Sequence, residues 1–472
     1  MNLNVPYSSA YDEGVYLSSA RLVMEGHTLF SSVFSAQPPA FLEILALAFR
    51  LFGDTVACGR AVMVFFSLIS LGTVAWISWR VAGPPASPLA IVSLGLPLLF
   101  FEMARTVEAE NPALTFALLA VALVLPGTEQ HSWKRLIAGG VLFALGMLCK
   151  LLVAPMILPI LFLLTLEPVS NRTMAWRFST ARPVFVSSIM RRCLIFTVAS
   201  ITTCLLAFSA YDPFAAYDQV VRFHMEAKSY FGTDTLSNLR LIYDHVLSTE
   251  LGIVFLAIAG LIILFARNRL AAAWISLWVF ATSLFLLDHS PLFDHHLILL
   301  LPPLAIAAAA SILWIPAFWH RSWGKLLPLF LLFPLICYDS TSGLEWTVER
   351  DLAESLNSHE PRQVQRVIDL IQKYTHPDDL VVDDQPMHVF AAERQSPPKL
   401  ADTSYVRIES GYLTADQAIN FSKDAQMVVF WTDRLALLPE YRRWVQTHFL
   451  LIKRFDVKHG KPREIYLRRS PP

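Results

Sequence analysis

Two adjacent acidic residues near the start of the chain, Asp12 and Glu13, are the side chains best suited to chemistry. They are followed by Gly14 and Tyr16 and precede a long, mostly apolar sequence. A carboxylate at a membrane surface can accept the proton of an attacking hydroxyl group, as a general base does. The alternative is that the pair forms an ordinary solvated acidic turn. The rest of the sequence shows which interpretation is favoured.

A second candidate group follows much later, where Asp294, His295 and His296 are consecutive. Neighbouring histidines beside an acid can bind a divalent metal cation. They can equally be polar residues at a membrane surface. A divalent metal cation is therefore the one cofactor that the sequence suggests.

The composition is that of a polytopic membrane protein. Of the 472 residues, 55% are hydrophobic and only 16% are charged, and the mean hydropathy is +0.48. In a soluble domain, about a quarter of the residues are charged. Lys plus Arg (38) equals Asp plus Glu (38), so no basic surface for nucleic acid is expected. The five cysteines are scattered without metal-ligand spacing, which argues against structural zinc and a disulfide framework.

We expect a polytopic α-helical membrane protein with about ten transmembrane helices, because backbone groups in lipid must be hydrogen-bonded within their own segment. The predicted spans are residues 61–81, 88–103, 111–126, 134–149, 151–167, 191–210, 250–266, 270–288, 296–318 and 325–339. Residues 1–60 then form a first outer loop with the acidic motif and interfacial helices. Residues 61–340 form the transmembrane region, and residues 341–472 form a small soluble α/β domain.

The basic residues of the connecting loops predict the orientation. If the chain begins outside, the inner loops lie near residues 80, 131–135, 172–192, 267–269 and 321–325, and they hold Lys and Arg in large excess over Asp and Glu. This is the positive-inside pattern. The acidic pair and most other unusual polar residues then share the outer face of the membrane.

After about residue 340 the composition becomes that of a soluble domain. Short apolar runs predict strands and amphipathic runs predict helices. The expected strands are residues 380–383, 427–431, 450–455 and 463–468, and the expected helices are residues 345–359, 361–374 and 439–449. Strands that alternate with helices indicate a small α/β domain. The outer segment 211–249 either forms a helix in the membrane interface or a plain packed loop.

The acidic stretch resembles a known family. Tyr11-Asp12-Glu13-Gly14-Val15-Tyr16, with Gln37-Pro38-Pro39-Ala40 and Leu51-Phe52-Gly53 after it, is similar to the first outer loop of the GT-C glycosyltransferases. More narrowly, it resembles the branch that contains protein O-mannosyltransferases and the lipid A aminoarabinose transferase, a bacterial dolichyl-phosphate-mannose-protein mannosyltransferase-like family. Residues 105–112, 148–150 and 294–303 resemble later motifs of that branch, so the resemblance covers roughly residues 7–340.

This resemblance implies a membrane glycosyltransferase of a bacterial plasma membrane, with the active site and the C-terminal domain on the periplasmic side. A sugar would leave a polyprenyl-phosphate carrier with inversion, when an acceptor hydroxyl of a lipid, glycan or protein attacks it. Asp12 would be the general base, and Glu13 would orient it or hold a second contact. Glu110 would be a second acid for the acceptor or a metal, and Lys150 and Arg105 would face the donor phosphate.

Each of these roles has a structural alternative. Glu108 and Glu110 could cap the helix expected from about residue 111, Lys150 could extend to the membrane surface, and Arg105 could pair with an acid. The family places a transmembrane helix before the acidic pair, whereas eleven residues precede Asp12 here. We expect either that an eleventh helix is encoded upstream or that this version lacks it.

Two other classes of protein are compatible with the composition. A transporter or flippase for a polyprenyl-linked glycan would place ionisable residues near the bilayer midplane, whereas the charged residues here flank the predicted spans. A membrane-anchored soluble domain would not need about ten spans. The sequence therefore favours chemistry at the outer surface.

Overall fold

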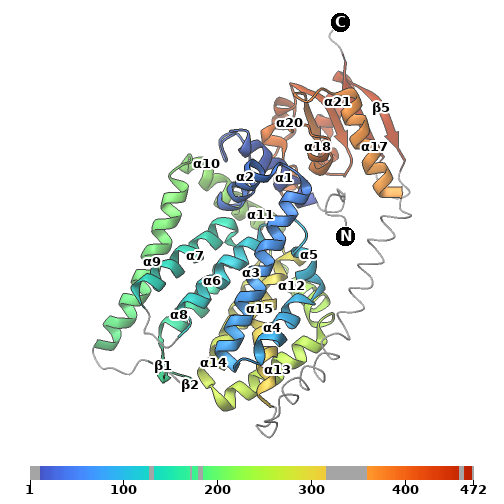
Figure 1. Ribbon diagram of the computed structural model, residues 1–472. Coiled ribbons are helices and arrows are strands. Elements are labelled where there is room, and N and C mark those ends of the chain that lie inside the picture. The colour runs from blue at the N-terminus through green and yellow to red at the C-terminus, as the bar shows by residue number, and fades with distance from the viewer. Residues whose placement is uncertain are drawn as a thin grey trace.

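The structure is a computed structural model in which residues 11–126, 132–170, 173–178, 184–314, 359–456 and 462–469 are described. Figure 1 shows a bundle of helices with an α/β domain at one end. At the opposite end lie the hairpin of β1 (Leu166–Ser170) and β2 (Thr173–Phe178) and the junction of α13 (Leu251–Arg267) with α14 (Arg269–Asp288). The α/β domain and the hairpin therefore mark the two ends of the molecule.

Four helical segments of the described residues are long and apolar enough to cross a membrane. They are α3 (Val56–Ala82), Ser187–Phe208 within α9 (Val184–Phe208), α14, and Asp294–Leu313, which joins η4 (Asp294–Leu300), α15 (Leu301–Ala310) and η5 (Ser311–Trp314). A bent pair gives a fifth span if it is counted as one: α13 lies at 92° to the preceding α12 (Thr235–Ile242) and η3 (Tyr243–Leu247). The predicted helical membrane fold is confirmed.

Several expected spans are shorter than a full crossing or are interrupted. The predicted span 88–103 is divided into α4 (Ala86–Gly95) and α5 (Leu98–Met103), because Pro97 between them has no backbone N–H and is not helical. Shorter apolar helices occupy three other predicted positions: α6 (Glu110–Val124), α7 (Trp133–Cys149), and η1 (Leu151–Met156) with α8 (Ile157–Leu164). The predicted span 325–339 and the predicted helix 345–359 lie outside the described residues.

Glycines allow pairs of these helices to pack closely. A Cβ atom on Gly260 of α13 would lie 1.9 Å from the carbonyl oxygen of Ala307 in α15. A Cβ atom on Gly140 of α7 would lie 2.4 Å from the carbonyl oxygen of Phe196 in α9. Backbones at these distances tolerate only glycine, and such small-residue contacts are typical of membrane helices.

Short helices cover the end of the bundle at which the α/β domain lies (Figure 1). They comprise α1 (Tyr11–Met24), α2 (Ala40–Phe52), α10 (Pro213–Tyr217), η2 (Asp218–Arg222) and α11 (Phe223–Phe231). The segment 211–249 is thus largely helical and is not a plain loop. Almost every residue of α1 is buried, so this helix is enclosed by the rest of the protein and does not lie on its surface.

The C-terminal domain contains a four-stranded sheet in the order β3-β4-β6-β5. β3 (Leu380–Asp383) is parallel to β4 (Ala425–Phe430), while β6 (Arg463–Arg468) is antiparallel to β4 and to β5 (Phe449–Phe455). Successive side chains of a strand point to opposite faces, and each face packs on its own helix. Val381 and Val429 pack with α17 (His359–Tyr374), and Val382 and Val428 pack with α21 (Pro439–His448). The predicted α/β domain is confirmed.

The α/β domain is packed against α1 through α18 (Pro386–Ala391). Arg21 donates from Nη1 to the Phe390 carbonyl oxygen over 3.1 Å, and its guanidinium lies 3.8 Å from the centre of the Phe390 ring. A Cβ atom on Gly14 would lie 2.5 Å from the backbone nitrogen of Met387. The helix that carries the acidic pair is therefore held between the membrane region and the α/β domain.

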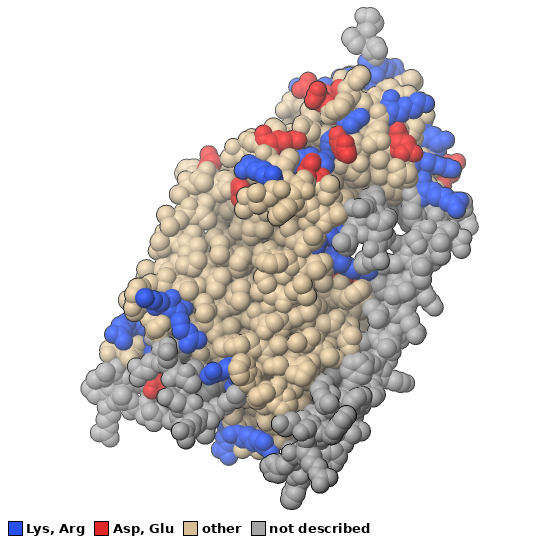
Figure 2. All heavy atoms as spheres, viewed as in Figure 1, with Lys and Arg blue, Asp and Glu red and all other residues tan. Residues whose placement is uncertain are grey.

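Charged residues are separated into two groups on the face shown in Figure 2. Lys and Arg gather at the end of the bundle away from the α/β domain, and a broad band without charged residues follows. Both signs of charge are mixed at the α/β end. An uncharged band between two charged ends is what a bilayer requires of a protein that spans it.

Candidate active site

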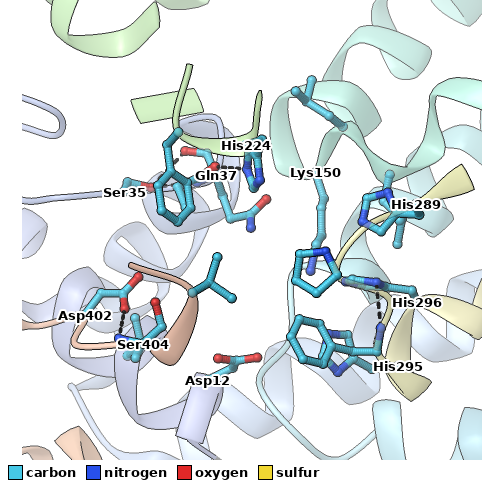
Figure 3. Close-up of a pocket in the computed structure, with 18 of the residues that line it drawn as sticks. Asp12, Ser35, Gln37, Lys150, His224, His289, His295, His296, Asp402 and Ser404 are labelled. Atoms are coloured by element: carbon cyan, nitrogen blue, oxygen red, sulfur yellow. Dashed lines mark hydrogen bonds between the residues drawn. The ribbon is translucent and has the colours of Figure 1, made fainter. Parts of the chain in front are cut away.

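A cavity of about 790 Å³ lies where the helical bundle meets the α/β domain. Its walls come from α1 and the segment after it, the turn after α7, α11, the loop between α14 and η4, and two loops of the α/β domain. Figure 3 shows the polar side chains around this space: Asp12, Ser35, Gln37, Lys150, His224, His289, His295, His296, Asp402 and Ser404. The sequence motifs for chemistry and the C-terminal domain thus meet at one place.

Asp12 is the residue of the acidic pair that lines the cavity. Within the described part of the chain its carboxylate has no hydrogen-bond or ion-pair partner. Burial raises the pKa of the Asp12 carboxyl above its usual value, and the nearby His295 and Lys150 oppose this shift. An unpaired carboxylate with a raised pKa accepts a proton more readily than an exposed aspartate does.

Glu13 faces away from the cavity and is completely buried. Arg60 of α3 holds both of its oxygens, from Nε at 2.8 Å and from Nη2 at 2.7 Å. The backbone N–H of Val107 donates to the same carboxylate over 3.1 Å. Consecutive residues of an α-helix point about 100° apart, so Glu13 can anchor α1 to the bundle while Asp12 faces the open space.

Glu110 and Lys150 form a buried ion pair next to the cavity, which Lys150 lines and Glu110 does not. Glu110 is the first residue of α6, and Lys150 is the extended residue that separates α7 from η1. Lys150 lines the cavity, and its ammonium group is bonded to Glu110 Oε1. Its side chain therefore ends at a buried carboxylate and does not extend to the outer surface.

Glu108 also lines the cavity, although sequence motifs favoured Glu110 as the second acid. Its side chain is buried, and Oε2 has no hydrogen-bond partner among the described residues. Burial raises the pKa of the Glu108 carboxyl well above its usual value, and the neighbouring charges of Asp12 and Glu110 add to this shift. Two acids, Asp12 and Glu108, therefore face the same space.

The two consecutive histidines complete the cluster around Glu110. His295 Nε2 lies 3.4 Å and His296 Nε2 lies 3.8 Å from Glu110 Oε1. Within the described residues these three side chains are a group that could hold a metal ion, with ligand atoms within 4.8 Å of one another. Glu110 Oε2 is buried without a partner, so one carboxylate oxygen is available to a cation besides the one that Lys150 occupies. Two imidazoles and a carboxylate suit a divalent cation such as zinc.

Arg105 is not part of this arrangement. Its guanidinium lies 4.9 Å from the centre of the Phe101 ring, and it does not line the cavity. The structure thus brings together Asp12, Lys150, His295 and His296 around the cavity, with Glu110 directly behind them. Glu13 and Arg105 lie outside it.

The α/β domain supplies a wall that the sequence did not predict. Asp402, Ser404, Tyr405 and Arg434 all line the cavity. Tyr11 connects this wall to α1, since its hydroxyl accepts a hydrogen bond of 2.7 Å from the Thr403 N–H. No sequence signal marks these residues, because they meet α1 only through packing between segments about 390 positions apart.

Comparison with known proteins supports the family resemblance that the sequence motifs indicated. Residues 36–189 match the family described as dolichyl-phosphate-mannose-protein mannosyltransferase. This match covers the segment after Asp12 and includes Glu110 and Lys150. No curated protein sequence gave a significant match to the chain.

The described structure has the fold of a GT-C glycosyltransferase. Its structure is similar to the crystal structure of ArnT from Cupriavidus metallidurans bound to undecaprenyl phosphate, with a TM-score of 0.62 and 16% sequence identity over 98% of this chain and 94% of that one. The apo state of the same protein gives a TM-score of 0.61 and 14% identity over 96% and 92%. The predicted GT-C fold is confirmed, and the similarity extends over both the bundle and the α/β domain.

Proposed function

We propose that the protein transfers a sugar from a polyprenyl-phosphate carrier to an acceptor hydroxyl, with inversion and with Asp12 as the general base. One observation carries this proposal: an unpaired carboxylate faces a cavity at the end of the helical bundle, across from a cluster of cationic and imidazole groups. The GT-C fold and the match to a mannosyltransferase family support it.

The two sides of the cavity correspond to the two halves of such a reaction. Asp12 accepts the proton of the acceptor hydroxyl as its oxygen forms a bond to the anomeric carbon of the sugar. The bond from this carbon to the phosphate oxygen breaks at the same time, and the polyprenyl phosphate leaves with the electron pair. Lys150, which lines the cavity, would stabilise the charge that develops on the departing phosphate.

Glu13 is assigned a positioning role. Its three hydrogen bonds to Arg60 and Val107 fix the rotation of α1 about its axis. Asp12 is the adjacent residue, so this anchor determines the direction of its carboxylate. Glu13 itself does not line the cavity.

A divalent cation is a further candidate at the same side of the cavity. Glu110, His295 and His296 would hold it, and Glu110 Oε2 is the oxygen without a partner among the described residues. When bound, the cation would act as a Lewis acid that neutralises charge on the departing phosphate. Removal of the metal with EDTA would then reduce transfer, and added zinc would restore it.

The α/β end of the molecule is proposed to face the periplasm. The basic loops gather at the other end, as the positive-inside rule requires of a cytoplasmic face. The described acids of the cavity lie at the α/β end and not at mid-bundle. That placement supports a transferase over a transporter, whose ionisable residues would lie near the midplane.

The test is transfer from labelled polyprenyl-phosphate sugars in membranes that contain the protein or its Asp12→Asn variant. Loss of the base is expected to reduce the rate at least about 100-fold. The wild-type rate should fall as the pH falls through the pKa of Asp12, because the base must be ionised. Burial raises this pKa, so the fall should begin above the pH at which an exposed aspartate is protonated, about 3.9.

Asp416→Asn is the matched control, since Asp416 is an exposed residue of α20 (Ala415–Phe421) away from the cavity. It should transfer sugar at the wild-type rate and reach the same amount in the membrane. Full activity of Asp12→Asn at wild-type abundance would show that Asp12 is not the base.

A further inference from the structure

One cationic side chain of the cavity has no counter-charge. Three Lys or Arg residues of the described chain line this space: Lys150, Lys228 and Arg434. Lys150 is bonded to Glu110, and Lys228 Nζ lies 2.7 Å from Asp288 Oδ2. The Arg434 guanidinium has neither a hydrogen-bond nor an ion-pair partner in the described structure, and its Nε is buried without one.

Arg434 is nevertheless held in a fixed place by two aromatic rings. Its central carbon lies 3.7 Å from the centre of the Tyr11 ring and 4.5 Å from the centre of the Tyr405 ring. Stacking covers the faces of a guanidinium but leaves its N–H groups, which lie in its plane, free to donate. A stacked arginine with unused donors beside a cavity is well prepared to bind a planar or tetrahedral oxyanion.

We propose that Arg434 is the anion-binding residue of the acceptor subsite, and that the acceptor carries a phosphate or carboxylate group near its reacting hydroxyl. This inference rests on the proposed transfer from a polyprenyl-phosphate sugar. It adds the chemical class of the acceptor and assigns a binding role to the α/β domain.

The position of Arg434 favours the acceptor over the donor. In an inverting displacement the acceptor oxygen and the departing phosphate lie on opposite faces of the sugar. Figure 3 shows Asp12 between Lys150 with the histidines and the α/β-domain residues Asp402 and Ser404. With the donor phosphate at Lys150, the acceptor approaches from the α/β domain. Arg434 stacks on Tyr405, the residue after Ser404, and therefore lies on this side.

Asp402, the acid on the same wall, does not neutralise Arg434. Asp402 Oδ1 accepts hydrogen bonds from the Ser404 N–H at 2.8 Å and from the Tyr11 hydroxyl at 3.3 Å. These contacts hold the carboxylate against its own loop. The acceptor anion takes no part in the bond changes: the acceptor hydroxyl proton passes to Asp12, and the donor phosphate leaves with the electron pair.

The experiment measures the acceptor requirement in membranes that contain the full chain. Labelled donor is held constant while an extract of acceptor from cells without the protein is diluted in series. Arg434→Gln should raise the half-saturating amount of extract about tenfold, as expected for one lost charge-assisted hydrogen-bond pair. The half-saturating donor concentration should stay within about twofold of the wild-type value. Arg434→Lys keeps the charge but not the planar fork, so its value should lie between the two.

Arg463→Gln is the matched control. Arg463 also stacks on an aromatic ring, with its central carbon 4.0 Å from the centre of the Trp431 ring, and it belongs to the same domain but does not line the cavity. Its acceptor and donor requirements should equal those of the wild type. If Arg434→Gln fails to accumulate, the comparison of Arg434→Lys with the wild type decides the question.

The labelled product is then separated by charge. Wild-type product should be retained on an anion-exchange resin after the donor is removed. Phosphatase treatment of the extract before the reaction should abolish acceptor activity if the anion is a phosphate, and carbodiimide coupling should abolish it if the anion is a carboxylate.

Three outcomes would overturn the inference while transfer itself remained: an uncharged product, insensitivity to both treatments, or a shift in the donor requirement of Arg434→Gln. Absence of transfer by the wild type from any polyprenyl-phosphate sugar would instead remove the proposed function and the inference with it.

Discussion

The two walls of the cavity differ in how their cationic side chains are held. In the wall built from membrane helices, Lys150 is bonded to Glu110, and His295 and His296 surround the same carboxylate. In the wall built from the α/β domain, Arg434 is stacked between rings and has no hydrogen-bond partner in the described chain. The buried ammonium group of Lys150 gains from its partner because the desolvation of an unpaired cation is unfavourable. A charge at the edge of a soluble domain can leave its donors to a ligand.

The largest effect is expected from breaking the helical wall. Lys150→Met removes the cation that we propose to face the donor phosphate, and it leaves Glu110 without its partner. Transfer should fall at least about 100-fold, the usual effect of losing one such electrostatic contact. Single-turnover transfer in membranes measures it.

Two further variants separate chemistry from folding at this position. The double variant Lys150→Met/Glu110→Gln removes both charges of this ion pair and leaves neither partner charged and alone, so it should accumulate normally and still fail to transfer. Lys228→Met, which breaks a more exposed pair with Asp288, should stay within about threefold of the wild type. Transfer at the wild-type rate by Lys150→Met would exclude the helical wall as the donor phosphate site.

The next comparison is between the two glutamates of the helical wall. Glu110→Gln should reduce transfer about tenfold or more, because it weakens a charge-assisted bond that positions Lys150. Glu108→Gln should have a smaller effect, since the raised pKa of Glu108 already favours its neutral form. Rates for both variants at equal abundance test this order. The reverse order would make Glu108, which lines the cavity, the second acid of the site.

A smaller effect on transfer is expected from a change at the contact between α1 and α18, which joins the helical region to the α/β domain. Gly14→Ala places a methyl group against the Met387 backbone and should reduce the stability of the contact between α1 and α18 by about 2 kcal/mol. The thermal unfolding midpoint should fall by a few degrees, and transfer should fall severalfold. Gly72→Ala is the control, because a Cβ atom there meets nothing within 4 Å. Equal midpoints for the two variants would contradict the close packing of α1 on α18.

The sequence predicted those features that depend on local pattern. The strands 380–383 and 463–468 are found at the expected residues, and the first of them is a short apolar run bounded by polar residues. The acidic motif singled out Asp12, and the resemblance of residues 148–150 to a family motif singled out Lys150; both residues line the cavity. The division of the predicted span 88–103 was missed, although Pro97 could have indicated it.

Features that depend on long-range packing were not predictable from one sequence. Glu13 was expected to orient Asp12 or to hold a second contact, but the sequence did not identify Arg60 and Val107 as the residues that bind it. Glu110 and the histidines were each singled out, yet no spacing rule relates positions that are nearly two hundred residues apart. Ser404 and Arg434 reach the cavity because the α/β domain packs on α1, and these two residues match no sequence motif.

The close contact at Gly14 also limits how the protein can be recombined. Asp12 faces the cavity from the same helix that presents Gly14 to Met387 and Arg21 to Phe390. The α/β domain is therefore not an interchangeable module. A chimaera that takes this domain from a relative must also take the matching surface of α1. Each such exchange would therefore also change the surroundings of the Asp12 carboxylate.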